Sequence, residues 1–578
     1  MSKQVSLRYL SYGFILLFAI VLCVGAHGCM RGAECRTDQG CEDGLLCRGG
    51  DCITQDLLKQ DGETCRFDLE CLRGRCIDQR CIPSVQEKVV ESAQESPDTE
   101  PFSKDGGESL PESPLSESAP EQEDKCKQPL CPIWSKRFGG LLQEAAVAIS
   151  THKDGSVYIT GRFTGSVRFG SKIFVAGAGD SFIAKLDKKG VIKWVDHLHG
   201  FHNDKTKQGQ VHIKDIAVSS DGSVYVVGLF LGSMDTTRGI LYAKNERGVR
   251  DGNGIDGFVQ KRRSTGEILW TRHVQSRFTA TLNGVTLDSK GYPFLIGNFI
   301  HEVQVANGQI HKGQGEGGIL LQMDPNGQAL NQQVFQSKNA FAMTDITLDQ
   351  KDNVYITGKV QGEVSFGKFT IKTPNQGKIT VPFVSKIVNK EVLWATSLQA
   401  ESYGSSSRIQ VNQNQEIYVV GKFGKSITLS GSKKLLAGKD NQSGFVVKLD
   451  TKGAPIWGKA AASQGSEAFS LILDKDENVV LWGSFVKSFA FGKTTLTTTI
   501  SKSPYIAKIS SSGDWQWAHK LGSSEFANST DLARSSDGEI YLLGTFQGNL
   551  FWPFNTASKS SKDLKSSGNF DVFVIALH

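Results

Sequence analysis

The chain has 578 residues, of which 39% are hydrophobic and 22% are charged, and its formal net charge is +5. The 32 Phe, 9 Trp and 11 Tyr can build a hydrophobic core, so the composition excludes a wholly disordered protein. One long apolar run is present, which excludes a protein that crosses a membrane many times. The length allows about three or four ordinary domains, or one large repeat domain with attachments.

Residues 1–28 are typical of a secretory signal peptide. Lys3 and Arg8 precede an apolar stretch, and small residues follow that stretch. Cys29 comes next, and this arrangement resembles the lipobox of bacterial lipoproteins, in which the cysteine is lipidated after cleavage. The resemblance implies export and attachment to the outer membrane or the cell surface through an N-terminal lipid. Plain secretion and an uncleaved membrane anchor are the two alternatives.

All 12 cysteines lie within the first 131 residues, and eight of them form two quartets of nearly equal spacing. We interpret residues 29–82 as two small modules held by disulfides, because modules this short bury too little apolar surface to fold unaided. The pattern resembles the EGF-like or Dickkopf-like modules of extracellular proteins. Zinc is not expected, since paired CxxC spacings are missing. The cysteines expected in disulfides, with the pairing left open, are Cys35, Cys41, Cys47, Cys52, Cys65, Cys71, Cys76, Cys81, Cys126 and Cys131.

Residues 83–125 have the composition of a disordered acidic linker. From residue 84 onward the segment holds 12 acidic residues against three lysines, together with five prolines. It shows no apolar periodicity, and its like charges repel one another. We therefore expect a solvated tether between the cysteine-rich modules and the remainder of the chain, residues 126–578.

Residues 126–578 contain an internal repeat. Seven copies of a β-branched or aromatic run include a glycine, and the copies are 61–69 residues apart. Each repeat is predicted to form four short strands joined by Asp-Gly and Asp-x-x-Gly turns. The second strand carries the glycine, and the fourth usually ends near a tryptophan. The glycines are Gly161, Gly228, Gly297, Gly358, Gly421, Gly483 and Gly544.

Four-stranded antiparallel units repeated at this length predict an all-β fold, a seven-bladed β-propeller. Residues 573–578 supply a third strand without a fourth, and residues 132–136 supply the missing strand. We therefore expect the N-terminal strand to close the ring. The recurring tryptophans are predicted to pack between strands. The glycine inside a strand is interpreted as a point of close approach between blades.

The motif VYITGxFxGxVxFG, at residues 157–170, is followed by DxFIAKLDxxGxIxW, at residues 180–194. Together they resemble the bacterial seven-bladed beta-propeller repeat proteins, the SBBP family. The resemblance covers about residues 132–578. It implies a fold and an exported location, and it implies no particular activity.

No catalytic motif stands out in the repeat domain. The sequence has no G-x-S-x-G elbow and no H-E-x-x-H pair, and no cysteine follows residue 131. Residues 126–578 carry a net charge of +15, which would suit an acidic glycan, a lipid head group or the acidic linker, or is simply a lysine-rich surface. Nucleic acid is not an expected partner. A monomer that requires no cofactor is expected.

Two functions are consistent with these features. The first is a tethered propeller that binds an extracellular glycan or protein. The alternative is a hydrolase or lyase that acts on a polysaccharide. An enzyme is expected to gather inequivalent polar residues at the central funnel of the ring, whereas a docking propeller need not do so.

The repeat around residues 195–256 is longer than the others because it carries two insertions of about seven and eight residues. Both are predicted on one face of the propeller, side by side. Their histidines would suit a transition metal, or an acidic ligand when protonated, and residues 251–256 resemble an incomplete calcium loop. A tolerated surface insertion is the alternative. The candidate ligand-binding residues are His197, His199, His202, Asp204, His212, Arg247, Arg250, Asp251, Asn253 and Asp256.

Overall fold

The computed structural model contains two compact units, Met1–Glu117 and Ser118–His578, which are considered separately. Within the first unit it describes four short strands. Within the second it describes residues 130–578 except 141, 171, 202–208, 238, 245–246, 248–253, 306–307, 431–432, 438–441 and 553–562. Among the described residues, no helix is long and apolar enough to span a membrane.

The described strands of the first unit form two antiparallel hairpins, β1 (Leu45–Arg48) with β2 (Asp51–Thr54) and β3 (Gly74–Ile77) with β4 (Arg80–Pro83). Cys47 lies opposite Cys52 in the first hairpin, and Cys76 lies opposite Cys81 in the second. The two hairpins therefore share one register, as expected for two copies of a module. The pairing of the cysteines stays a prediction.

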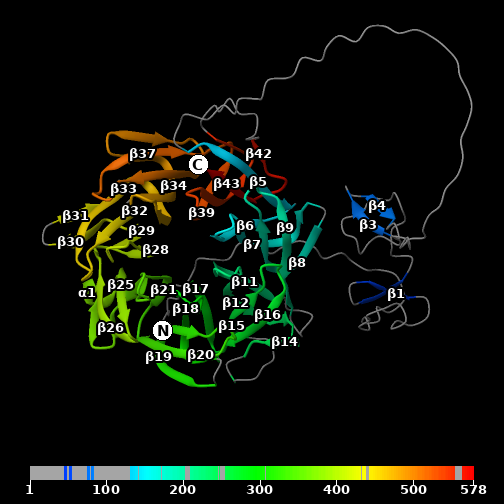
Figure 1. Ribbon diagram of the computed structural model, residues 1–578, viewed down its shortest axis with the longest axis horizontal. Coiled ribbons are helices and arrows are strands. Elements are labelled where there is room, and N and C mark those ends of the chain that lie inside the picture. The colour runs from blue at the N-terminus through cyan, green and yellow to red at the C-terminus, as the bar shows by residue number, and fades with distance from the viewer. Residues whose placement is uncertain are drawn as a thin grey trace, which may run out of the picture. The chain divides into compact units, whose positions relative to one another are not determined.

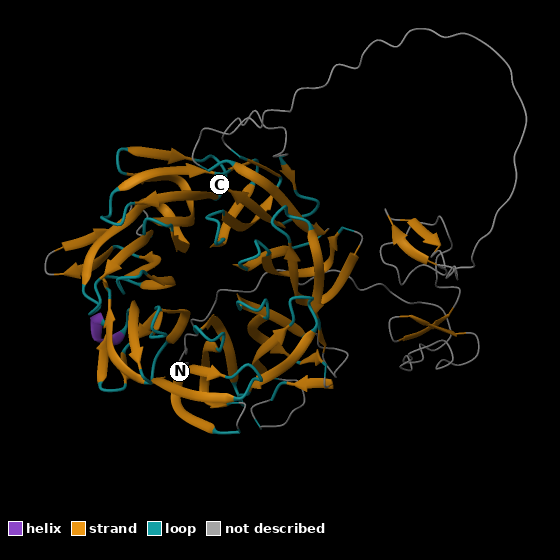
Figure 2. Ribbon diagram, viewed as in Figure 1, coloured by secondary structure: helices purple, strands orange, loops and turns teal. Residues whose placement is uncertain are grey.

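The second unit is built from antiparallel meanders of four strands, each running from an innermost to an outermost strand around a common centre (Figures 1 and 2). The first three comprise β6 (Glu144–Thr151), β7 (Val157–Phe169), β8 (Lys172–Leu186) and β9 (Ile192–Leu198); β11 (Gln210–Val218), β12 (Val224–Leu231), β15 (Ile255–Arg262) and β16 (Ile268–Val274); and β17 (Thr279–Leu287), β18 (Pro293–Gln304), β19 (Ile310–Met323) and β20 (Ala329–Ser337).

The following meanders repeat this order, and one long strand serves two of them. They comprise β21 (Phe341–Leu348), β22 (Val354–Gln361), β25 (Thr380–Val388) and β26 (Glu391–Ser397); β28 (Gly404–Val411), β29 (Ile417–Phe423), β32 (Ser443–Leu449) and the first half of β33 (Pro455–Leu473); the second half of β33 with β34 (Val479–Phe491), β36 (Ser503–Ile509) and β37 (Trp515–Lys520); and β39 (Phe526–Arg534), β40 (Ile540–Gln547), β43 (Asp571–Leu577) and β5 (Pro132–Gly140).

Shorter elements lie outside these meanders, mostly where the connection between second and third strands forms a hairpin. They are β10 (Gly200–Phe201), β13 (Ser233–Thr236), β14 (Gly239–Tyr242), β23 (Glu363–Phe366), β24 (Phe369–Lys372), α1 (Pro374–Gly377), β27 (Gln399–Ala400), β30 (Ser426–Ser430), β31 (Lys433–Leu436), β35 (Thr494–Thr497), β38 (Gly522–Ser523), β41 (Asn549–Phe551) and β42 (Leu564–Lys565).

The last meander is completed by the first strand of the unit. β5 pairs antiparallel with the C-terminal strand β43, from Val572 opposite Phe138 to Leu577 opposite Pro132. This pairing confirms the closure predicted from the two ends of the repeat domain. It also covers the edge of β43, whose backbone N–H and C=O groups would otherwise be unpaired.

The recurring glycine of the second strand serves a different purpose from the one predicted. A Cβ added at these seven positions would lie 1.9–2.9 Å from a carbonyl oxygen of the innermost strand in the same meander, and 1.9 Å from Ala342 O at Gly358. The innermost strand bulges here, for example between Met343 and Asp345. The glycine is thus required by a bulge within the meander, and its interpretation as a blade-to-blade contact is wrong.

The close approach between neighbouring meanders occurs at the recurring tryptophans. Trp134 donates a hydrogen bond from Nε1 to Lys188 O at 2.8 Å, across to the turn of the next meander. A Cβ on Gly190 in that turn would lie 2.8 Å from the Trp134 ring. The same bond recurs from Trp194, Trp270, Trp394 and Trp457. These contacts confirm the prediction that the recurring tryptophans serve packing.

Candidate functional site

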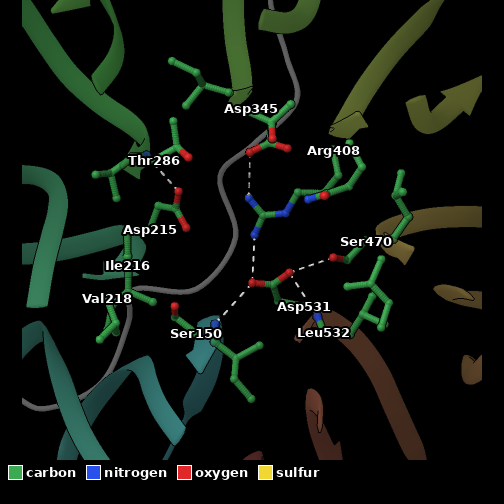
Figure 3. Close-up of a pocket in the computed structure, with 18 of the residues that line it drawn as sticks. Ser150, Asp215, Ile216, Val218, Thr286, Asp345, Arg408, Ser470, Asp531 and Leu532 are labelled. Atoms are coloured by element: carbon green, nitrogen blue, oxygen red, sulfur yellow. Dashed lines mark hydrogen bonds and ion pairs between the residues drawn. The ribbon is translucent and has the colours of Figure 1, made fainter. Parts of the chain in front are cut away.

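A cavity of about 350 Å³ lies where the innermost strands converge. Its wall includes residues from β6, β11, β17, β21, β28, β33 and β39, which are the innermost strands of all the meanders. Figure 3 shows polar and apolar side chains around the cavity, with Asp215, Asp345, Arg408 and Asp531 near its centre. The lining includes Ser150, Asp215, Thr286, Asp345, Thr347, Arg408, Gln410, Ser470 and Asp531.

Several of these residues occupy one equivalent position of the repeat. Each follows the bulge of its innermost strand and stands thirteen residues before the glycine of the second strand. Equivalent positions would hold similar residues if they served the fold alone. Instead they hold Ala148, Asp215, Gly284, Asp345, Arg408, Ser470 and Asp531.

The three aspartates at this position link neighbouring meanders. Each accepts a hydrogen bond from a backbone N–H of the next innermost strand. Val285 N–H donates to Asp215 at 2.9 Å, Ile409 N–H to Asp345 at 2.8 Å and Ile149 N–H to Asp531 at 3.2 Å. The last of these bonds joins the closing meander to the first one, so the aspartates hold the ring together as well as line its centre.

Arg408 neutralises part of this acidic ring. Its guanidinium lies 3.3 Å from Asp345 and 2.9 Å from Asp531, and it reaches across the centre of the cavity (Figure 3). Burial opposes its charge, but Asp531, Asp345 and Asp215 together raise the pKa of Arg408. Asp531 also accepts a hydrogen bond from Ser470 Oγ at 2.7 Å. If all four groups are ionised, three carboxylates face one guanidinium.

Asp215 is the least compensated member of the ring. It is only 7% exposed, and among the described residues its one hydrogen-bond donor is Val285 N–H. Its carboxylate points into the cavity in Figure 3. Burial raises the pKa of Asp215 to about 7, and burial also raises the pKa of Asp345 to about 6. The cavity therefore contains carboxyl groups that take up and release protons near neutral pH.

Sequence reasoning missed this ring, although the sequence contains a signal for it. The glycine of the second strand was identified in every repeat, and the central residue always stands thirteen positions earlier. Comparing that column across the repeats would have singled out Asp215, Asp345, Arg408 and Asp531. Inequivalent polar residues at the central funnel were expected of an enzyme and not required of a docking propeller, and the structure does place such residues there.

β10, in the connection that carries the first insertion, pairs with β13, in the connection that carries the second. Repeats without insertions show the same pairing, β27 with β30 and β38 with β41, and residues 202–208 and 248–253 lie outside the described residues. The side-by-side placement of the two insertions therefore stays a prediction. His197 and His199 are brought together with Asp180, a residue that the sequence did not single out. His212 is near this group, and burial lowers its pKa to about 4.

The remaining candidate residues are placed as follows. Asp256 is fully buried and accepts hydrogen bonds from Lys244 N–H, Ser276 N–H and His273 Nε2, so its carboxylate is engaged within its own meander. Arg247 lies in the connection between β14 and β15. His202, Asp204, Arg250, Asp251 and Asn253 lie outside the described residues, as does the first half of the calcium-like segment, residues 251–253.

No family model matches the chain. An uncharacterized WD repeat-containing protein of Acanthamoeba polyphaga mimivirus is 22% identical over 215 residues, which cover 32% of this chain and 16% of that protein. The chain thus spans about a sixth of the length of this relative.

Solved structures with propeller-like folds are also similar. A protein of unknown function from Dyadobacter fermentans is 10% identical, with a TM-score of 0.34, covering 68% of this chain and 98% of its own. A mutant of the Synechocystis apocarotenoid oxygenase is 11% identical, with a TM-score of 0.35 and coverages of 71% and 87%. A rhamnogalacturonan lyase is 11% identical, with a TM-score of 0.28 and coverages of 75% and 76%. The repeat domain is a β-propeller by its own strand topology, and these likenesses extend to the fold alone.

Proposed function

We propose that the chain is an exported seven-bladed β-propeller, tethered to the cell envelope through a lipid on Cys29, that binds an extracellular glycan in its central cavity. The observation that carries the binding proposal is the residue column at the ring centre. Repeats that are alike elsewhere differ there, and they place Asp215, Asp345, Asp531 and Arg408 around one cavity.

The proposal of seven blades is supported by the match between the repeats of the sequence and the meanders of the structure. The sequence has seven copies of the strand with the glycine, and each copy is the second strand of one four-stranded meander. Residues 83–125 would act as the spacer between a membrane and the propeller. A lipidated N-terminal peptide that begins at Cys29 is expected by mass spectrometry of the mature protein, and an unmodified soluble product would contradict the tether.

A glycan fits the chemistry of the cavity wall. Sugar hydroxyl groups both donate and accept hydrogen bonds, so they suit a mixture of carboxylates, a guanidinium, hydroxyls and an amide. A volume of about 350 Å³ lies at the lower end of the range of ligand pockets, which favours one or two sugar units over a folded protein partner. A charged amino sugar would match the excess of carboxylates.

Glycan-array binding followed by titration calorimetry, using the full mature chain, tests this proposal. Asp215→Asn keeps an oxygen for Val285 N–H and removes the charge that faces the cavity. We expect at least tenfold weaker glycan binding for this variant, and wild-type binding for Asp476→Asn, which changes an exposed turn aspartate. The proposal fails if no glycan binds, if Asp215→Asn binds equally well, or if the wild type captures only proteins.

A second candidate function is cleavage of the bound polysaccharide. The specific observation is the raised pKa of Asp215, about 7, and of Asp345, about 6, beside Asp531 in an ion pair with Arg408. A carboxyl group that holds its proton near neutral pH can act as a general acid next to an ionised one. Release of reducing ends or unsaturated products by the wild type and not by Asp215→Asn would support an enzyme. Stable glycan that is bound and never cleaved would leave a binding protein.

A further inference from the structure

Asp180, His197 and His199 form a cluster at the outer part of the first meander, away from the central cavity; we call it the Asp180 cluster. Asp180 is on β8, and the two histidines are at alternating positions at the end of β9 and just after it. Alternation in an extended chain places both imidazoles on one face of the sheet, where both contact Asp180 of the neighbouring strand. One nitrogen of each histidine and one oxygen of Asp180 lie within 4.8 Å of one another.

The contacts of the cluster converge on a single oxygen. Asp180 Oδ2 accepts from His197 Nε2 at 2.9 Å and from His199 Nδ1 at 2.8 Å. Asp180 Oδ1 accepts from Gly200 N–H at 2.9 Å, which fixes the plane of the carboxylate. Although burial opposes ionisation, the two histidines lower the pKa of Asp180, so the carboxylate is charged.

Two other meanders have an aspartate with a basic partner at the equivalent positions, and they lack the second histidine of the Asp180 cluster. Asp256 pairs with His273 at 2.7 Å, and Asp571 pairs with Arg137 at 2.7 Å, at the same places on their third and fourth strands. An aspartate with one basic partner is therefore a recurring structural pair. The second histidine is not: Gln275 and Gly139 stand two residues after those basic partners, where the Asp180 cluster has His199.

We propose that the Asp180 cluster binds one divalent transition-metal ion, with His197 Nε2, His199 Nδ1 and Asp180 Oδ2 as ligands. Two imidazoles and one carboxylate form a donor set that suits zinc, copper or nickel and disfavours calcium and magnesium, which prefer oxygen ligands. The metal would replace the two hydrogen bonds between the imidazoles and Asp180: a protonated imidazole would release its proton to solvent, and a neutral one would bind through its unprotonated nitrogen. The three ligand atoms already lie within 4.8 Å of one another, so small side-chain movements suffice.

The surroundings of the cluster are also those of a metal site. Gly200 N–H on Oδ1 is the kind of supporting hydrogen bond that orients a ligating carboxylate. Phe163 and Phe174 pack against the His197 ring with centroids 5.0 and 5.6 Å away, which restrains its orientation. The His199 side chain is 44% exposed, so the ion could enter from solvent and keep water in its open positions.

Zinc titration calorimetry on the oxidised full chain, without a histidine tag, tests the site. We expect one zinc ion per chain with micromolar or tighter affinity at pH 7.5, and at least tenfold weaker binding for His199→Ala. His301→Asn is the matched control, because His301 is an exposed histidine outside the cluster, and this variant should bind zinc as the wild type does. His199 is exposed enough that its replacement should leave the melting temperature of the metal-free chain nearly unchanged.

A second readout uses protons. Metal ions and protons compete for the imidazole nitrogens, so zinc affinity should fall as the pH is lowered from 7.5 to 5.5. Absence of zinc, copper and nickel binding would overturn the proposal. Equal affinity in the wild type and in His199→Ala would overturn it as well, because binding would then lie elsewhere in the chain. Neither outcome depends on the central cavity, whose variants should bind zinc normally.

Discussion

At the scale of single residues, the central ring places two aspartates in opposite energetic situations. Asp531 has the Arg408 guanidinium at 2.9 Å and three further donors, from Ser470, Ile149 and Leu532. Asp215 has one backbone donor, and the Asp345 and Asp531 charges repel its own. The charge of Asp531 is thus stabilised by its ion pair and hydrogen bonds. The charge of Asp215 lowers the stability of the native state, and its hydrogen bond to Val285 N–H does not require that charge.

Asp215 should make the native state less stable as the pH rises. Its folded pKa is about 7 and an unfolded aspartate titrates near 4, so between these values the native state holds a proton that the unfolded state has released. The cost is therefore absent below about pH 4 and complete above about pH 7, with an upper bound of roughly 4 kcal/mol. Asp215→Asn should remove it. Urea unfolding should show the variant gaining more stability over the wild type at pH 8 than at pH 5, where only part of the cost has developed, and an equal difference at both values would contradict this.

Asp531→Asn should have the opposite effect at neutral pH. Removing this charge leaves the partly buried Arg408 guanidinium with Asp345 at 3.3 Å as its remaining close ion pair. Breaking a buried pair typically costs about 3–5 kcal/mol. Denaturant unfolding at pH 7.5 should show a loss of this order for Asp531→Asn, whereas Asp215→Asn under the same conditions should show none. Loss of stability in both variants to the same extent would mean that the two aspartates are equivalent.

At the scale of strands, a bulge and a glycine form one device. The innermost strand has one extra residue at the bulge. Next to the bulge, a carbonyl oxygen of this strand lies where a Cβ on the second-strand glycine would be, as Ala342 O does at Gly358. The bulge of each innermost strand also determines the repeat position that faces the ring centre. Asp215, Asp345, Arg408 and Asp531 occupy this position.

Gly358→Ala should destabilise the domain strongly, because its Cβ would lie 1.9 Å from Ala342 O and 2.9 Å from the Phe383 ring. Neither group can move without disturbing the sheet, so we expect a loss of about 3 kcal/mol or more. Gly313→Ala is the control, since its nearest neighbour is a flexible glutamine side chain at 3.6 Å. Thermal unfolding of both variants measures the difference, and similar melting temperatures would exclude a steric role for the strand glycine.

At the scale of the whole chain, the repeat domain depends on its closing strand. β5 covers the edge of β43, and Trp134 on β5 extends the contact to the turn of the next meander. The Asp531 bond to Ile149 N–H and the Arg137 pair with Asp571 cross the same junction. Cys131, immediately before β5, is disulfide-bonded, and its pairing with Cys126 stays a prediction.

Deleting residues 126–140 should leave two unpaired strand edges at the junction and cause aggregation or a loss of stability far above the roughly 1 kcal/mol of a typical substitution. Deleting residues 84–120, which belong to the expected linker, should leave the melting temperature nearly unchanged. Size-exclusion chromatography and thermal unfolding of both deletions compare the two. A first deletion that melts like the parent would show that closure contributes nothing.

The sequence by itself determined the class of fold, the repeat and the closing strand. These depend on periodic hydrophobicity, turn residues and recurring glycines, which are local and appear seven times over. The packing of the tryptophans was predicted for the same reason. The predicted reason for the strand glycines, a contact between blades, was wrong. A bulge within one sheet and a contact between two sheets both require a glycine, so the sequence does not distinguish them.

Only the tertiary structure decided where chemistry gathers. The central residues are 61–69 positions apart in sequence, and each repeat alone offers one unremarkable aspartate or arginine. Closure of the ring places them around one cavity, and burial there changes their protonation. Asp180 likewise looked like one more repeat residue until the pairing of β8 with β9 set it against two histidines. The separation of two residues in the sequence does not predict these side-chain contacts, whereas the pairing of the strands determines them.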